Sequence, residues 1–163
     1  MRIILKNKET LLCEDFEFSC SIGKNGTTLK KFEGDKKTPK GIYSLGPLYY
    51  RKDRIHNPKT KLKKIEIKRF MGWCDDVNSR HYNKLIKKNE NIRYENLYRK
   101  QRNYDLLIPI NYNTKKIKKK KGSAIFLHLT KNYKKTLGCI AISKNDMLIL
   151  LKLINKKTKI EIL

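Results

Sequence analysis

The sequence has few cysteines, and their spacing matches neither a metal site nor a disulfide framework. The 163 residues contain four cysteines and three histidines, with no CxxC pair and no His/Cys spacing typical of zinc. A chain of this length can bury a hydrophobic core without disulfides. We therefore expect no metal and interpret Cys13 and Cys20 as small apolar core residues and Cys74 as structural. The disulfide state of these three cysteines stays open.

Long apolar runs are also absent. No stretch reaches the roughly 20 apolar residues that a membrane-spanning helix needs, so no transmembrane segment is predicted. The apolar stretch within residues 1–6 is too short for the hydrophobic region of a secretory signal. We therefore expect no signal peptide. This leaves open whether the protein stays inside the cell, begins upstream or is exported by another route.

Acidic residues are scarce: 15 Asp and Glu stand against 40 Lys and Arg, for a net charge of +25. Such an excess attracts polyanions, including nucleic acid. The basic residues are spread almost evenly, however, with 19 in residues 1–81 and 21 in residues 82–163. Lysine outnumbers arginine, whereas base recognition favours the arginine fork. We expect no specific nucleic-acid partner, and a basic module that binds an acidic polymer remains an alternative.

Short strand-like segments separated by turns dominate the chain. Alternating or apolar segments that end in Gly, Pro or polar turns predict strands over residues 2–5, 10–13, 16–22, 41–46, 64–68, 104–110, 123–128 and 159–162. The first two form a predicted hairpin. The segments 104–110 and 123–128 are the most continuously apolar, which indicates interior strands.

One helix is predicted near the C-terminus. Ser143 is a suitable N-cap, and Asp146 places a carboxylate in the first turn. The apolar stripe that follows consists of Met147, Leu150, Leu151 and Ile154. Many strands with one helix indicate a mainly β barrel or sandwich. We predict a single domain over residues 1–163, with a polar, tyrosine-rich excursion around residues 78–103 that has weak helical periodicity at 94–99.

The pattern with the clearest chemical meaning is His128 at the end of an apolar run, followed by Cys139 behind a glycine. A thiol becomes a good nucleophile when a nearby base or cation favours the thiolate. A strand that brings an imidazole beside a cysteine-bearing turn would build such a pair. The alternative is a core strand that ends in histidine next to a small, inert, buried cysteine.

Three blocks of the sequence resemble the YkuD-like L,D-transpeptidases, bacterial enzymes that cross-link or trim peptidoglycan. The blocks are residues 34–43, residues 72–76 with 82–83, and residues 122–128 with 136–141. The third block departs from the common family pattern, because Leu137 replaces a histidine and Ala141 stands where arginine is usual. Both changes fit the branch that carries the second block.

The resemblance implies an L,D-transpeptidase-like β-barrel or sandwich with Cys139 as nucleophile and His128 as proton acceptor and donor. It implies peptidoglycan stem peptides as substrate, a role in cell-wall biogenesis and cell shape, a place in the cell envelope or periplasm, and no cofactor. Transpeptidation and hydrolysis of the same bonds, by an L,D-carboxypeptidase or endopeptidase, both remain open. We expect a monomer.

Several further residues are candidates for this site. Backbone support for an oxyanion is expected from Gly138 and Ile140, and a backbone carbonyl is expected to orient the imidazole, because Leu129 has no side-chain acceptor. The segment 34–41 reads as a rigid turn or as a wall of the substrate cleft. Trp73 either packs in the core or lines the substrate cleft. The aspartates that follow it either bind an ammonium group of the substrate or compensate the charge of nearby lysines. The candidates for the substrate cleft are Thr136, Trp73, Asp75, Asp76 and Tyr133.

Overall fold

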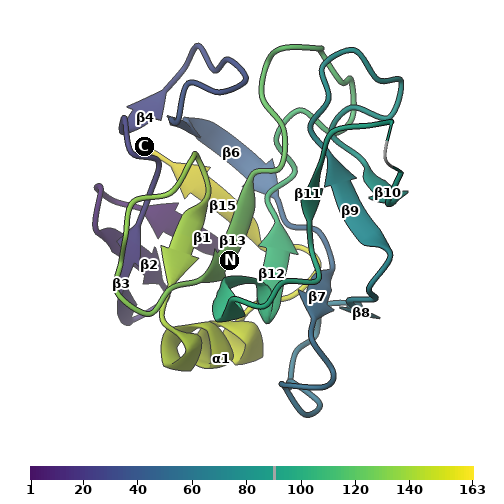
Figure 1. The fold of residues 1–163 in the computed structure, drawn as a ribbon. Helices are drawn as coiled ribbons and strands as arrows, with labels where there is room; N and C mark the ends of the chain where they lie inside the picture. Colours follow the sequence, from purple (N-terminus) through teal and green to yellow (C-terminus); the bar gives the residue numbers. More distant parts are fainter. Residues whose placement is uncertain (90) are drawn as a thin grey trace.

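The computed structural model describes residues 1–89 and 91–163, and a curled ten-stranded sheet dominates the fold (Figure 1). Its strand order is β6-β15-β1-β2-β3-β14-β13-β12-β7-β8. The bounds of these strands are β1 Arg2–Leu5, β2 Thr10–Cys13, β3 Phe16–Ser21, β6 Gly41–Ser44, β7 Leu48–Tyr50, β8 Lys64–Glu66, β12 Leu106–Pro109, β13 Phe126–Leu129, β14 Ile140–Ile142 and β15 Lys159–Ile162. The mainly β prediction is confirmed.

The N-terminal hairpin forms as predicted. β1 and β2 pair antiparallel with Ile3 opposite Cys13, and β15 runs parallel to β1 on its other side. Alternate side chains of β1 and β15 are buried because successive residues of a strand face opposite sides of the sheet. Cys13 and Cys20 are buried in the core, as expected, and all four cysteines are free thiols.

The helix α1 spans Lys144–Leu153 and lies against one end of the sheet (Figure 1). The Ser143 side chain accepts a hydrogen bond from the Asp146 N–H at 3.1 Å, which confirms the predicted N-cap. The predicted apolar stripe is fully buried: Met147, Leu150, Leu151 and Ile154. No described helix is long and apolar enough to cross a membrane.

Two small sheets complete the fold. β9 (Met71–Cys74) lies between β10 (Leu85–Lys87) and β11 (Tyr94–Asn96), and β4 (Thr27–Thr28) pairs with β5 (Thr38–Pro39). The weak helical periodicity at 94–99 does not produce a helix, because Tyr94 pairs with Cys74 in the antiparallel ladder between β11 and β9. The polar excursion is therefore anchored to β9, and its residue 90 lies outside the described residues. A 3₁₀ turn over Arg102–Tyr104 leads into β12.

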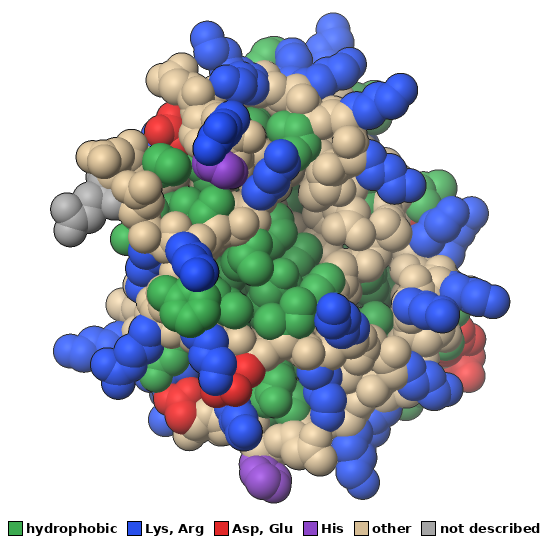
Figure 2. Space-filling model, turned by 90° about the vertical axis from the view of Figure 1, so that its right-hand side faces the viewer, with side chains coloured by type: hydrophobic (Ala, Val, Ile, Leu, Met, Phe, Trp, Pro, Cys, Tyr) green, Lys and Arg blue, Asp and Glu red, His purple; other side chains and the backbone are tan. Residues whose placement is uncertain are grey.

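A second apolar cluster packs between the small β9 sheet and the main sheet. Its centre is Phe126 on β13, whose ring meets Trp73 and Tyr104 edge-on at centroid distances of 5.2 and 5.9 Å. Cys139 belongs to this cluster. On the side that bears β9 and β10, at the right of Figure 1, hydrophobic side chains fill a hollow and Lys and Arg ring it rather than gathering in one patch (Figure 2).

Candidate active site

His128 and Cys139 lie at one cavity of about 850 Å³, which is lined by residues of β13, β14, the 3₁₀ turn and the loop over residues 130–137. β13 and β14 run parallel with His128 opposite Ala141, and Cys139 directly precedes β14. The parallel pairing brings the end of an interior strand beside the turn that carries the cysteine. The structure thus brings together the two residues that the sequence singled out.

The Cys139 thiol is held by the backbone of the preceding segment. Its Sγ lies 3.2 Å from the Ala124 carbonyl oxygen, to which it donates, and it accepts a hydrogen bond from the Phe126 N–H at 3.3 Å. The residue is only 8% exposed. Burial, reinforced by the negative charge of Glu95, raises the pKa of this thiol to about 12. At neutral pH the resting thiol is therefore protonated.

The His128 imidazole is oriented by the carbonyl of its neighbour. Nδ1 lies 2.9 Å from the Leu129 carbonyl oxygen, and because a carbonyl only accepts, Nδ1 carries the proton. The expected backbone carbonyl partner is confirmed. Burial lowers the pKa of the imidazole to about 4, although the bond to Leu129 opposes this. His128 is thus neutral at pH 7, and Nε2 is left with a free lone pair.

The turn before the cysteine is closed by Thr136. Its hydroxyl donates to the Cys139 carbonyl oxygen at 2.6 Å and accepts from the Gly138 N–H at 3.1 Å. Gly138 has a φ of +140°, a backbone conformation that residues other than glycine rarely adopt. Among the hydrogen bonds of the described residues, none involves the Cys139 N–H as donor. Thr136 lines the cavity, as predicted for a cleft residue.

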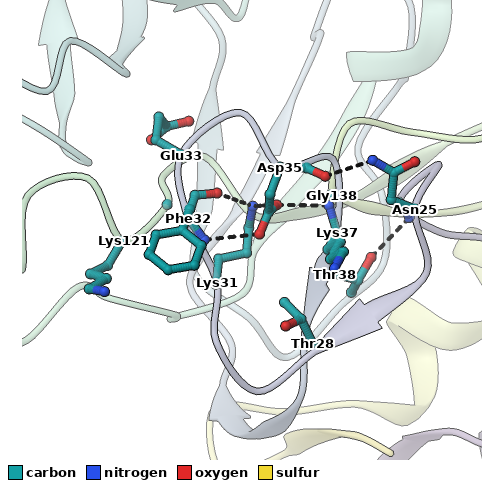
Figure 3. A network of polar contacts seen from close by, with 12 residues as sticks. Asn25, Thr28, Lys31, Phe32, Glu33, Asp35, Lys37, Thr38, Lys121 and Gly138 are labelled. Carbon is teal, nitrogen blue, oxygen red and sulfur yellow. Dashed lines mark hydrogen bonds and ion pairs between the residues drawn. The ribbon is translucent and has the colours of Figure 1, made fainter.

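The segment 34–41 forms a rigid turn that supports the cysteine turn from behind (Figure 3). The Asp35 carboxylate accepts from the Phe32 and Lys37 N–H groups, both at 2.9 Å, and from the Lys31 ammonium at 2.5 Å. A Cβ on Gly138 would lie 3.0 Å from the Lys37 carbonyl oxygen. None of residues 34–41 lines the cavity among the described residues, so the turn interpretation of this block is the one the structure favours.

The other predicted cleft residues lie away from the cavity. Trp73 is buried beside Phe126, and its indole N–H donates to Asn83 Oδ1 at 2.9 Å. Asp75 pairs with Arg93 at 3.1 Å, and Asp76 accepts from a backbone N–H in its own loop. These aspartates therefore have protein partners already. Tyr133 lines a separate cavity of about 380 Å³.

Among the cavity residues that the sequence did not predict, three lie next to the reacting pair. Glu95, Arg99 and Tyr104 come from the polar excursion and the 3₁₀ turn and line the same cavity as Cys139. The Tyr104 ring packs on the His128 ring at a centroid distance of 5.2 Å. The only signal in the sequence was the length of the excursion, since long segments in compact domains are often functional. Within residues 1–89 and 91–163, no group of three His, Cys, Asp or Glu side chains is placed to hold a metal ion.

Residues 2–162 match the model of the L,D-transpeptidase catalytic domain called YkuD. The chain belongs to this family. Its members are generally cysteine-dependent enzymes that modify peptidoglycan. The resemblance of the three sequence blocks is thereby confirmed, and it now extends over nearly the whole chain.

Two solved structures are similar to this chain. One is the helical cell shape determining protein Pgp2 from Campylobacter jejuni, at 19% identity and a TM-score of 0.51. The other is Bd1075 from Bdellovibrio bacteriovorus, at 18% identity and a TM-score of 0.48. Each alignment covers 99% of this chain and 46% of the other, so the chain spans slightly less than half the length of either. No curated protein matches. The likeness to Pgp2 supports the fold alone.

Proposed function

We propose that this protein is an L,D-transpeptidase that acts on peptidoglycan stem peptides through a thioester on Cys139. The observation that carries the proposal is the shared cavity of His128 and Cys139, with Nδ1 bound to Leu129 so that Nε2 can accept a proton. Family membership supports the substrate class. The single-domain organisation, the monomeric state, the absence of a cofactor and a place in the cell envelope stay predictions.

The first step is attack of the thiol on the carbonyl before the terminal D-amino acid. Because both groups rest neutral, the proton moves from Sγ to His128 Nε2 as the carbon–sulfur bond forms. The Phe126 N–H, which already points at the sulfur, stabilises the charge on Sγ during this transfer. Substrate that displaces water from the cavity also strengthens that interaction.

The tetrahedral intermediate needs donors for its oxyanion. We assign this role to the Cys139 N–H together with the Gly138 N–H, which would exchange its Thr136 partner for the substrate oxygen. Ile140, opposite Leu127 in the β13–β14 pair, supports the turn from the strand side. A donor of this kind typically contributes about 3 kcal/mol to stabilisation of the transition state.

Collapse of the intermediate releases the D-amino acid. The His128 imidazolium gives its proton to the leaving amine as the carbon–nitrogen bond breaks, which leaves the thioester and a neutral imidazole. An incoming amine is then deprotonated by Nε2, attacks the thioester carbonyl and returns Cys139 to the thiol. Water in place of that amine gives hydrolysis, the activity of the alternative carboxypeptidase or endopeptidase.

Purified disaccharide-tetrapeptide followed by mass spectrometry tests the proposal. Loss of the terminal D-residue with a new cross-link supports transpeptidation, and loss of that residue alone supports the hydrolytic alternative. The Cys139→Ala and His128→Asn variants should be inactive while their unfolding curves at pH 8 show a folded protein. No reaction by the folded wild-type protein would remove the enzyme hypothesis and leave binding of an anionic polymer as the remaining function.

A further inference from the structure

Arg99 is a cation fixed at the wall of the active-site cavity. Its Nη2 donates to Glu95 Oε1 at 2.7 Å and its Nε donates to the Asn96 carbonyl oxygen at 2.8 Å. The guanidinium carbon lies 3.8 Å from the centre of the Tyr104 ring. Five N–H groups are available on an arginine, and these two bonds occupy two of them. The side chain is 25% exposed, so it is held in place and still open to a ligand.

The same stack links Arg99 to the reacting pair. Both the Arg99 guanidinium and the His128 imidazole contact the Tyr104 ring, with the guanidinium carbon 3.8 Å from the ring centre and the two ring centroids 5.2 Å apart. Burial is the largest cause of both pKa shifts: it lowers the pKa of His128, to which the positive charge of Arg99 adds, and raises the pKa of Cys139, which the charge of Arg99 partly opposes. Its charge is therefore present where the bond is broken, whereas the lysines of the cavity wall belong to its exposed rim.

The chemistry of the leaving group makes a cation at this distance useful. His128 must give a proton to the amine of the departing D-amino acid, and the carboxylate of that residue is attached to the same carbon. When the amine lies at Nε2, the carboxylate therefore lies within about one residue's length of the imidazole. Arg99 and His128 both contact Tyr104 and line the same cavity, and the planar fork of an arginine matches a carboxylate better than a lysine ammonium does.

We propose that Arg99 binds the carboxylate of the leaving D-amino acid and so selects peptides with a free C-terminus. The inference rests on the proposed function of Cys139 and His128. Glu95 orients the guanidinium, because its carboxylate accepts hydrogen bonds from both Arg99 and the Tyr104 hydroxyl. Arg99 therefore binds the substrate carboxylate without having to reorient, which lowers the entropic cost of binding.

The test compares two substrates: disaccharide-tetrapeptide and the same molecule with its C-terminal carboxylate converted to an amide. The wild-type protein should process the acid about 10- to 100-fold faster in kcat/KM, the range for a charge-assisted hydrogen bond. Arg99→Gln should lose about that factor on the acid and little on the amide, so that the preference disappears. Arg102→Gln serves as the matched control, since Arg102 lines the same cavity but is 77% exposed.

Removal of Arg99 alone leaves the Glu95 carboxylate without its ion-pair partner. The double variant Glu95→Gln/Arg99→Gln removes both charges, and it should also lose the preference, with thermal unfolding recorded for each variant. Glu95→Gln alone keeps Arg99 and should keep the preference. Equal loss on acid and amide in Arg99→Gln, or no preference in the wild-type protein, overturns the inference while the proposed function stands. Failure of the folded wild-type protein to process either substrate overturns both.

Discussion

The buried neutral imidazole of His128 makes the stability of the fold depend on pH in a way that can be calculated. In the unfolded chain a histidine has a pKa near 6.5, whereas burial lowers the pKa of His128 to about 4 in the folded protein. Between these values the unfolded state binds a proton that the folded state does not. Acid therefore favours unfolding through this residue, and the contribution of His128 is fully present only above pH 6.5.

The magnitude follows from the gap between the two pKa values. At about 1.4 kcal/mol for each pH unit, a fall from pH 7 to pH 4 should cost the folded state about 3 kcal/mol through His128 alone. His128 is 8% exposed, so solvent screening reduces this figure little. Below pH 4 both states carry the proton and the contribution of this residue no longer changes.

Urea unfolding from pH 8 to pH 4 measures the effect. Carboxylates such as Asp35, whose pKa is lowered against the effect of burial by bonds from Lys31, Phe32 and Lys37, also titrate in acid. The His128→Asn variant keeps those carboxylates, and its new side-chain amide can donate a hydrogen bond to the Leu129 carbonyl. The difference in free energy of unfolding between the two proteins should change by about 3 kcal/mol over this range. Parallel curves would refute the assignment of a buried neutral imidazole.

Three further predictions concern the nucleophile, its turn and the helix. Alkylation of Cys139 should be slow at neutral pH and accelerate as the pH approaches 12, because burial raises the pKa of its thiol; a rate that saturates below pH 8 would contradict this. Gly138→Ala should lower stability by about 1–3 kcal/mol and reduce turnover, since a Cβ would strain a φ of +140° and approach the Lys37 carbonyl oxygen; unfolding and kinetics would both have to match wild type to contradict it. Ser143→Ala should cost about 1 kcal/mol in thermal unfolding through loss of the bond from the Asp146 N–H, whereas unchanged activity per folded molecule is expected.

Local patterns in the chain predict the helix and eight of the fifteen strands that the structure describes. The hairpin of β1 and β2, the Ser143 cap and the alternation in β15 depend on residues near one another in sequence, so local geometry suffices to specify them. β11 escaped prediction because its strand conformation comes from pairing with Cys74, a long-range contact that its own polar residues do not encode.

Sequence patterns singled out His128 and Cys139 as candidates for the chemistry, because an apolar run ends at the histidine and a glycine precedes the cysteine, and the resemblance of three blocks to a known family favoured catalysis over an inert buried thiol. The protonation states of these two side chains depend on the tertiary structure. Burial leaves both His128 and Cys139 neutral, because the loss of hydration destabilises their charged forms more than the nearby hydrogen bonds and charges stabilise them. Packing of the polar excursion against β13 also decided that Arg99 reaches the cavity, and no local pattern carries that information.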